Sequence, residues 1–155
     1  MIIWLAISTP IILIFLVLLM NQANLTQAPG IKHRLKLFLQ TNTAEISSEP
    51  VLPELKAPVF DLSPDQLFEQ ILSAARAFDW EIKHSDATSH TLHLVVTTGL
   101  WKFKDDIRVT VVKQDNGSSL HAVSQSRLGR GDFAANSHHL QQLLNQLTGS
   151  RSGLK

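Results

Sequence analysis

The residues best suited to chemistry lie in the second half of the chain. Asp105 and Asp106 are adjacent carboxylates, and Arg127 and Arg130 follow further along. Paired carboxylates suit general acid–base catalysis, whereas arginines suit the binding of carboxylates or phosphates. Because neighbouring residues of a strand point to opposite faces, Asp105 and Asp106 cannot act together on one substrate. We expect Asp106 to form a structural ion pair with Arg127 instead.

A polar corner is predicted where Gly129, Arg130 and Gly131 precede a helix. The glycines allow unusual backbone angles, and the first N–H groups of a helix have no partner inside it. Together with Arg127 and Arg130, these groups can receive an anion. Gly129, Gly131 and the two arginines form the candidate anion-binding site.

A structural role for the same corner remains open. Asp132 or Asn136 can cap the helix, and Asp106 can form an ion pair with Arg127. Both contacts together would leave no group free to bind a ligand. Asp106, Arg108, Asp132 and Asn136 are therefore predicted to form a structural ion pair or a polar face. No catalytic residue is assigned.

Composition argues against several other functions. The chain has no cysteine, which excludes disulfides, thiolate nucleophiles and cysteine-based metal sites. His90 and His93 are expected to face opposite ways on a strand, and His138 and His139 to diverge on a helix. A net charge of +1 with interleaved signs gives no electrostatic footprint for nucleic acid. We expect no metal, no cofactor and no nucleic-acid partner.

The elements that position these residues can be predicted from local patterns. Ser63 and Gln66 around Pro64 form a capping box, which predicts a helix that ends near Phe78. Apolar spacing predicts a second helix that ends at Gly149. Between the helices, alternating patterns predict four strands, which cover about 80–85, 91–97, 103–113 and 119–127. The fold class is α+β, with a four-stranded antiparallel meander and both helices packed on one face.

The turn between the last two strands predicts their register. Asn116 and Gly117 are typical of a two-residue hairpin loop, which would place Asp106 opposite Arg127 and Val109 opposite Ser124. One face would then be apolar and covered by the helices, with Ile107, Val109, Val111, Leu120 and Ala122. The other face would be polar, with Asp106, Arg127, Arg108, Gln125, Thr110 and His121.

The N-terminal segment predicts membrane attachment. Ile2 to Met20 contains no charged residue and would rise about 28 Å as a helix, close to the roughly 30 Å hydrocarbon core. No basic residue precedes it and the run exceeds a signal-peptide core, so an uncleaved anchor is favoured over a cleaved signal. The predicted divisions are an anchor (1–22), a basic juxtamembrane segment with an extended linker or irregular wrap (23–58), the domain (59–148) and a flexible tail (149–155).

Basic residues after the apolar run indicate the orientation. Lys32, Arg34 and Lys36 favour a domain on the cytoplasmic side of a cell (inner) membrane, and the periplasmic side stays open. Their segment either lies at the interface near anionic headgroups or docks on the domain as a short helix. The expected partners are the lipid bilayer and either a membrane protein or an anionic lipid headgroup.

Two motifs carry a family resemblance. They are Trp101-Lys102-Phe103-Lys104-Asp105-Asp106 and Ser124-Gln125-Ser126-Arg127-Leu128-Gly129-Arg130-Gly131-Asp132-Phe133-Ala134-Ala135-Asn136. They resemble the bacterial and plastid family named domain of unknown function 1499, over about Thr41 to Leu147. Lys102 and Val123 stand where the family has arginine, Ala134 where it has glycine, and His138-His139 where it has an arginine pair. A cysteine pair found in one form of the family is absent. The resemblance implies a small, often envelope-associated domain and supplies no activity.

Two function classes remain open. The first is a membrane-anchored, non-catalytic binding or assembly module. The second is an envelope hydrolase that uses Asp106, Arg127 and Asp132. The lack of cysteine and of a convincing nucleophile favours the first class. A solvent-open pocket with at least three of Asp106, Arg108, Arg127 and Asp132 would favour the second.

Overall fold

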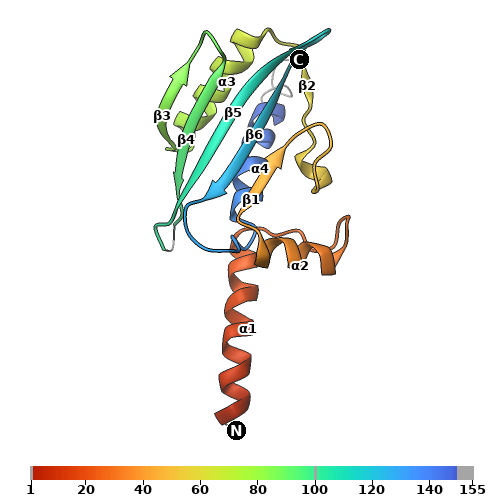
Figure 1. Cartoon of the computed structure of the whole chain (residues 1–155), viewed down its shortest axis with the longest axis vertical. Helices are drawn as coiled ribbons and strands as arrows, with labels where there is room; N and C mark the ends of the chain where they lie inside the picture. Colours follow the sequence, from red (N-terminus) through yellow and green to blue (C-terminus); the bar gives the residue numbers. More distant parts are fainter. Residues whose placement is uncertain (1, 100, 150–155) are drawn as a thin grey trace.

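The computed structural model describes residues 2–99 and 101–149, with the backbone alone for residues 2–8. This part of the chain forms four α-helices, one short 3-10 helix and six strands (Figure 1). In chain order they are α1 (Ile2–Met20), α2 (Ile31–Gln40), β1 (Thr43–Ile46), η1 (Pro53–Leu55), β2 (Val59–Phe60), α3 (Pro64–Ala77), β3 (Glu81–Asp86), β4 (Thr91–Thr97), β5 (Lys104–Gln114), β6 (Gly117–Ser126) and α4 (Ala135–Gly149).

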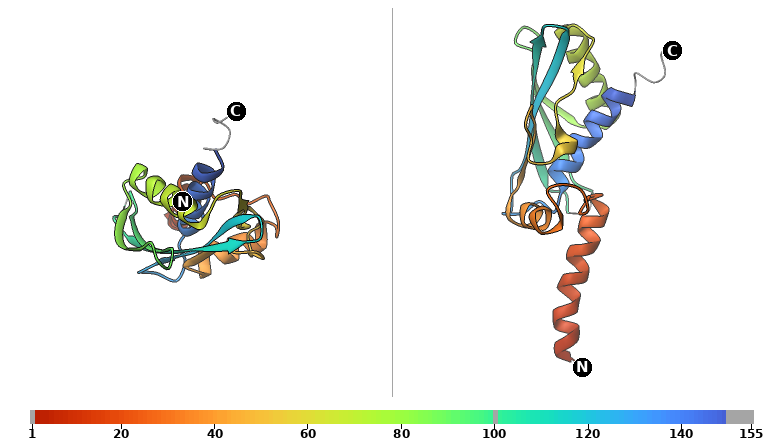
Figure 2. Two further views of the ribbon diagram at one scale, coloured as in Figure 1. Left: turned by 90° about the horizontal axis from the view of Figure 1, so that it is seen from above. Right: turned by 90° about the vertical axis from the view of Figure 1, so that its right-hand side faces the viewer.

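The strands form one antiparallel sheet in the order β1-β6-β5-β4-β3, and β2 pairs with the same edge of β6 as β1. Helices α3 and α4 cover one face of this sheet (Figure 2). The α+β class, the antiparallel meander of β3 to β6 and the two helices on one face are confirmed. The predicted number of strands, four, is wrong because β1 and β2 add two. Strand β1 comes from the segment predicted as a linker or wrap (23–58), whereas β2 lies at the start of the predicted domain (59–148).

Local signals place the first helix of the domain as expected. The Ser63 hydroxyl accepts a hydrogen bond from the Gln66 N–H at 3.2 Å, and the Gln66 side chain accepts one from the Ser63 N–H at 2.9 Å. Pro64 occupies the first helical position, where its missing N–H costs nothing. The apolar face of α3 is buried through Leu67, Phe68 and Ile71.

The hairpin register differs from the prediction by two positions. Asp115 and Asn116 form the loop, so Val109 lies opposite Ala122 and Asp106 lies opposite Gln125. The predicted pairs of Val109 with Ser124 and of Asp106 with Arg127 are wrong. A shift of two keeps every side chain on its face, whereas a shift of one reverses it. The apolar face is therefore confirmed, with Ile107, Val109, Val111, Leu120 and Ala122 all buried.

Gly117 explains the shift. A Cβ atom on this residue would lie 2.0 Å from the backbone oxygen of Phe60, and its φ is +121°. Glycine is therefore needed inside β6, where the neighbouring strand β2 approaches closely. Asn116 and Gly117 resemble a complete two-residue loop, but only Asn116 belongs to the loop, and Gly117 is the first residue of β6.

Helix α1 extends away from the domain, as both side views show (Figures 1 and 2). Its C-terminal end is docked: Leu18 is buried, and the side chain of Asn21, which follows the helix, donates a hydrogen bond to the Phe133 carbonyl at 2.8 Å. Within the described side chains, no helix combines the length and the hydropathy that a membrane crossing needs. The predicted anchor at 1–22 includes Met1 and the side chains of residues 2–8, which lie outside that description.

Candidate functional site

Asp132 caps the N-terminus of α4. Its Oδ1 accepts the Ala134 N–H at 3.0 Å, and its Oδ2 accepts the Asn136 N–H at 3.1 Å. Its backbone carbonyl accepts the Ala135 N–H at 3.0 Å. Burial raises the pKa of Asp132, and the hydrogen bonds from Asn136 and Ala134 oppose that rise. The start of the helix is therefore occupied by a carboxylate from the chain itself.

A buried polar network surrounds the side chain of Asn136, which is fully buried. Its Nδ2 lies 2.9 Å from the Asn42 carbonyl, 2.9 Å from Ser126 Oγ and 2.7 Å from Asp132 Oδ2. The Ser124 hydroxyl donates to Asn136 Oδ1 at 2.6 Å. The network joins β6, α4 and the residue that leads into β1.

The two glycines of the corner allow close backbone packing. A Cβ atom on Gly131 would lie 2.3 Å from the Leu39 carbonyl oxygen, so α2 can approach only glycine here. Gly129 has a φ of +91°, and its carbonyl accepts a hydrogen bond from the Asn42 side chain at 3.0 Å. Both glycines therefore have a structural role that needs no ligand.

Asp106 and Arg127 form a bidentate ion pair on the open face of the sheet. Arg127 Nε lies 2.7 Å from Oδ2 and its terminal nitrogen 2.8 Å from Oδ1, and His93 Nε2 lies 2.7 Å from Oδ1. The Arg127 guanidinium holds the pKa of Asp106 well below its usual range, and His93 adds to that effect. The pair forms diagonally, because the register does not place the two residues opposite each other.

Arg108 and Arg130 are exposed and form no side-chain hydrogen bond or ion pair within the described residues. Arg108 belongs to the polar sheet face, and Arg130 lies in the loop before α4. No hydrogen bond among the described residues links Arg127 or Arg130 to the capped helix start. Of the two arginines proposed to bind an anion, Arg127 is paired with Asp106. Arg130 has no hydrogen bond to the capped helix start among the described residues.

Asp105 points to the opposite face from Asp106, as the strand geometry requires. Its carboxylate lies 3.1 Å from His139 Nε2 on α4, and both side chains are buried. The Trp80 ring packs against His139 in an edge-on arrangement at 6.2 Å. Sequence reasoning missed this contact because the pairing depends on how α4 crosses the sheet.

Sequence reasoning left the segment around Arg34 open between a position near headgroups and a short helix docked on the domain. Helix α2 is docked, and Arg34 is fully buried and forms a bidentate ion pair with Glu54, with both contacts at 2.7 Å. It also donates to the carbonyls of Gln27 and Ala28. The available signal was its spacing from the buried Phe38, which lies one helical turn later.

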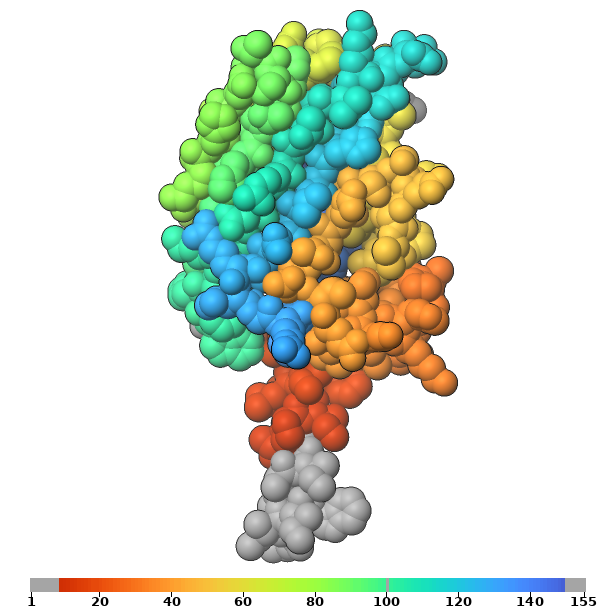
Figure 3. All heavy atoms as spheres, in the orientation of Figure 1, coloured from red at the N-terminus to blue at the C-terminus, as the bar shows by residue number. Residues whose placement is uncertain are grey.

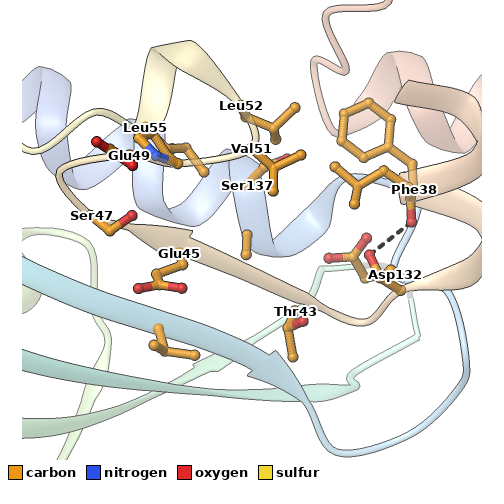
Figure 4. A pocket seen from close by; sticks show the side chains of 15 residues that line it. Phe38, Thr43, Glu45, Ser47, Glu49, Val51, Leu52, Leu55, Asp132 and Ser137 are labelled. Carbon is orange, nitrogen blue, oxygen red and sulfur yellow. Dashed lines mark hydrogen bonds between the residues drawn. The ribbon is translucent and has the colours of Figure 1, made fainter. Parts of the chain in front are cut away.

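A cavity of about 310 Å³ lies between α2, β1 and the loop that precedes η1 (Figure 4). Figure 3 shows the hollow on the molecular surface beside α2. Phe38 and Leu52 supply apolar wall, and the carboxylates of Glu45, Glu49 and Asp132 also line it. No lysine, arginine or histidine is among the lining residues. The cavity therefore favours an apolar ligand with a cationic group over an anionic one.

The cavity also bears on the hydrolase reading. Of the four residues whose joint presence in a pocket would favour it, only Asp132 lines the cavity. Asp106 and Arg127 lie on the open sheet face with His93. The three proposed hydrolase residues are thus divided between two parts of the domain.

A family model described as "Protein of unknown function (DUF1499)" matches residues 34–147, which is more than half of the chain. The chain belongs to this family. The resemblance recognised in the sequence is thereby confirmed, and the match begins at Arg34 of the buried ion pair. No match to a curated protein was found.

Several residues that carry the DUF1499 resemblance now have a structural role. Ser124, Ser126, Asp132 and Asn136 make the buried network at the start of α4. The shared motif is therefore explained largely by folding, and a ligand has to be sought on other surfaces.

Proposed function

We propose that this DUF1499 protein is a membrane-anchored, non-catalytic binding module, with α1 inserted in the bilayer and the domain held against it. The observation that carries the proposal is the exposed apolar surface of α1. About half or more of each of these side chains is exposed: Ile11, Ile12, Leu13, Phe15, Leu16, Leu19 and Met20. A helix apolar on all sides needs an apolar surrounding, which a bilayer provides.

The docked end of α1 supports a fixed connection. Leu18 is buried against the domain and Asn21 is hydrogen-bonded to Phe133, so the helix is not tethered by a flexible linker alone. Lys32 and Lys36 follow α1 closely and are exposed, which favours the cytoplasmic side of a cell membrane. Protease protection in sealed vesicles tests that orientation.

Membrane insertion is tested with the full chain. Leu13→Arg combined with Leu16→Arg changes two exposed side chains, so the domain should fold normally. Each arginine costs about 2.5–3.5 kcal/mol at the centre of a spanning helix, so the variant should be extracted from membranes by alkaline carbonate. Val59→Arg is the control, because Val59 is an exposed apolar residue of β2 that does not line the cavity. Equal retention of both variants and the wild type after washing would contradict the anchor.

The cavity is the proposed ligand site of the module. Cyclohexylamine and cyclohexanecarboxylate have similar shape and opposite charge, so comparing them separates apolar fit from charge preference. The amine should bind saturably and the carboxylate should not, and Glu45→Gln with Glu49→Gln should weaken the amine. Binding is followed by the chemical shifts of cavity residues. Equal binding of both probes, or of neither, would contradict the charge assignment.

A further inference from the structure

Three segments that are distant in the chain meet where α1 joins the domain: α2, residues 101–103 and residues 127–131. Figures 1 and 3 show these regions at the α1 end of the domain, and the second view in Figure 2 agrees. We call the surface formed by these three segments the base.

Hydrogen bonds hold the base together. The Phe133 N–H donates to the Phe38 carbonyl of α2 at 2.9 Å, and the Phe133 carbonyl accepts from Asn21 at the end of α1. The Arg127 N–H donates to the Lys104 carbonyl at 3.1 Å, which links the last loop to the start of β5. The position of the base relative to α1 is therefore fixed by contacts within the domain.

The base exposes large apolar side chains that have no cover. They are Ile31, Leu39, Trp101, Phe103 and Leu128, with exposed fractions between 37% and 67%. The rings of Trp101 and Phe103 stack with their centroids 6.1 Å apart. Tryptophan is enriched at the level of lipid headgroups, and Trp, Phe and Leu are typical of the apolar face of interfacial helices.

All lysine, arginine, aspartate and glutamate residues of the base are basic ones. The base contains six of the 14 lysines and arginines of the chain and none of its 13 acidic residues. Arg34 and Arg127 are held in ion pairs with Glu54 and Asp106. The other four, which form no ion pair or side-chain hydrogen bond within the described residues, are Lys32, Lys36, Lys102 and Arg130.

We propose that the base lies on the headgroups of anionic phospholipids in the bilayer that holds α1. The inference rests on the proposed function, since α1 must bring the domain to the membrane. Exposed apolar and aromatic side chains would enter the interface, and the four unpaired cations would lie near lipid phosphates. The domain would then have one fixed orientation, with Arg130 contacting lipid rather than a soluble anion.

The cysteine-free chain allows a direct test by single-cysteine labelling of the full-length protein. Leu128→Cys and Phe103→Cys report on the base, Leu16→Cys on α1, and Val59→Cys on β2 away from the base; all four side chains are exposed. Each variant carries a fluorophore in vesicles of phosphatidylcholine and phosphatidylglycerol in a three-to-one ratio. A nitroxide on the lipid headgroup quenches labels that lie near it.

The base labels should be quenched at least about twofold more than the label at position 59. A quenched label at 16 with base labels that match position 59 would overturn this inference and leave the anchor intact. An unquenched label at every position would instead overturn the anchor, and this inference with it.

Charge is tested with a second set of variants in the Leu128→Cys background. Lys32→Gln, Lys36→Gln and Arg130→Gln together should reduce quenching in the anionic vesicles, whereas Lys113→Gln, at an exposed site beside the β5–β6 turn, should not. Quenching should also fall when phosphatidylglycerol is left out. Unchanged quenching in the triple variant and in neutral vesicles would refute the role of anionic lipid.

Discussion

Asn136→Ala should destabilise the domain strongly, because it removes the centre of the buried network. The substitution deletes a fully buried amide that is hydrogen-bonded to three side chains and one backbone carbonyl. Ser124 Oγ would lose its acceptor, and the Asn42 carbonyl and Ser126 Oγ would each lose a donor. Asp132 Oδ2 would keep only its backbone contact.

The expected loss follows from the cost of unsatisfied groups. A buried donor or acceptor left without a partner costs about 1–3 kcal/mol. Water entering the space would satisfy part of the network, so we expect a total loss of about 3–4 kcal/mol. For a chain of this size, such a change corresponds to roughly 10 °C in melting temperature.

Chemical denaturation of the full chain in detergent measures this loss, followed by tryptophan fluorescence, because Trp80 is buried in the domain and becomes exposed on unfolding. Asn145→Ala is the matched control, since Asn145 is exposed on the same helix and alanine favours helix formation. That variant should change the free energy of unfolding by less than about 0.5 kcal/mol. If Asn136→Ala lost no more stability than Asn145→Ala, the structural reading of the motif would be refuted.

Three further predictions concern the other contacts of the site. Arg34→Leu should cost about 3–5 kcal/mol by leaving the Glu54 carboxylate unpaired, and adding Glu54→Leu should recover part of the loss in a double-mutant cycle by denaturation. The pKa of Asp106 is depressed in the folded protein, so its contribution is present above the unfolded value of about 3.9 and is lost as pH falls below it. The stability difference between Asp106→Asn and wild type should therefore be full at pH 7 and shrink below about pH 4; a constant difference would contradict the assignment. Gly131→Ala should cost about 1–3 kcal/mol because its Cβ would meet the α2 backbone, whereas Gly99→Ala, with open space around it, should be nearly neutral by thermal denaturation.

The helices and the faces of the sheet were predictable because their signals are local. The capping box at Ser63 and the apolar spacing of α3 are contained within the helix itself. Strands β1 and β2 were not predictable in this way, since they have four and two residues and are too short to show alternation. They are strands because they pair with the edge of β6, which is a long-range contact.

The hairpin register and the burial of Arg34 also depend on long-range contacts that local sequence patterns do not reveal. Gly117 has its place because Phe60 approaches it from another strand, so a rule based on the turn alone gave the wrong loop. Arg34 can be buried because Glu54, twenty positions later in the chain, forms an ion pair with it. The spacing of Arg34 from Phe38 is compatible with a docked helix, but the local pattern does not reveal Glu54, the partner that allows the guanidinium to be buried.

The candidate site was difficult to read for a chemical reason. Asp, Asn, Ser and Arg bind ligands with the same groups that cap helices and satisfy buried carbonyls. The sequence could identify the corner at Asp132 and Asn136, but it left both uses open. In the structure, Asp132 and Asn136 are hydrogen-bonded within the helix cap and the buried network, and Arg127 forms an ion pair with Asp106. Ligand recognition by this chain is therefore better sought where polar or apolar groups lack internal partners, and among the described residues the base and the cavity beside α2 are two such places.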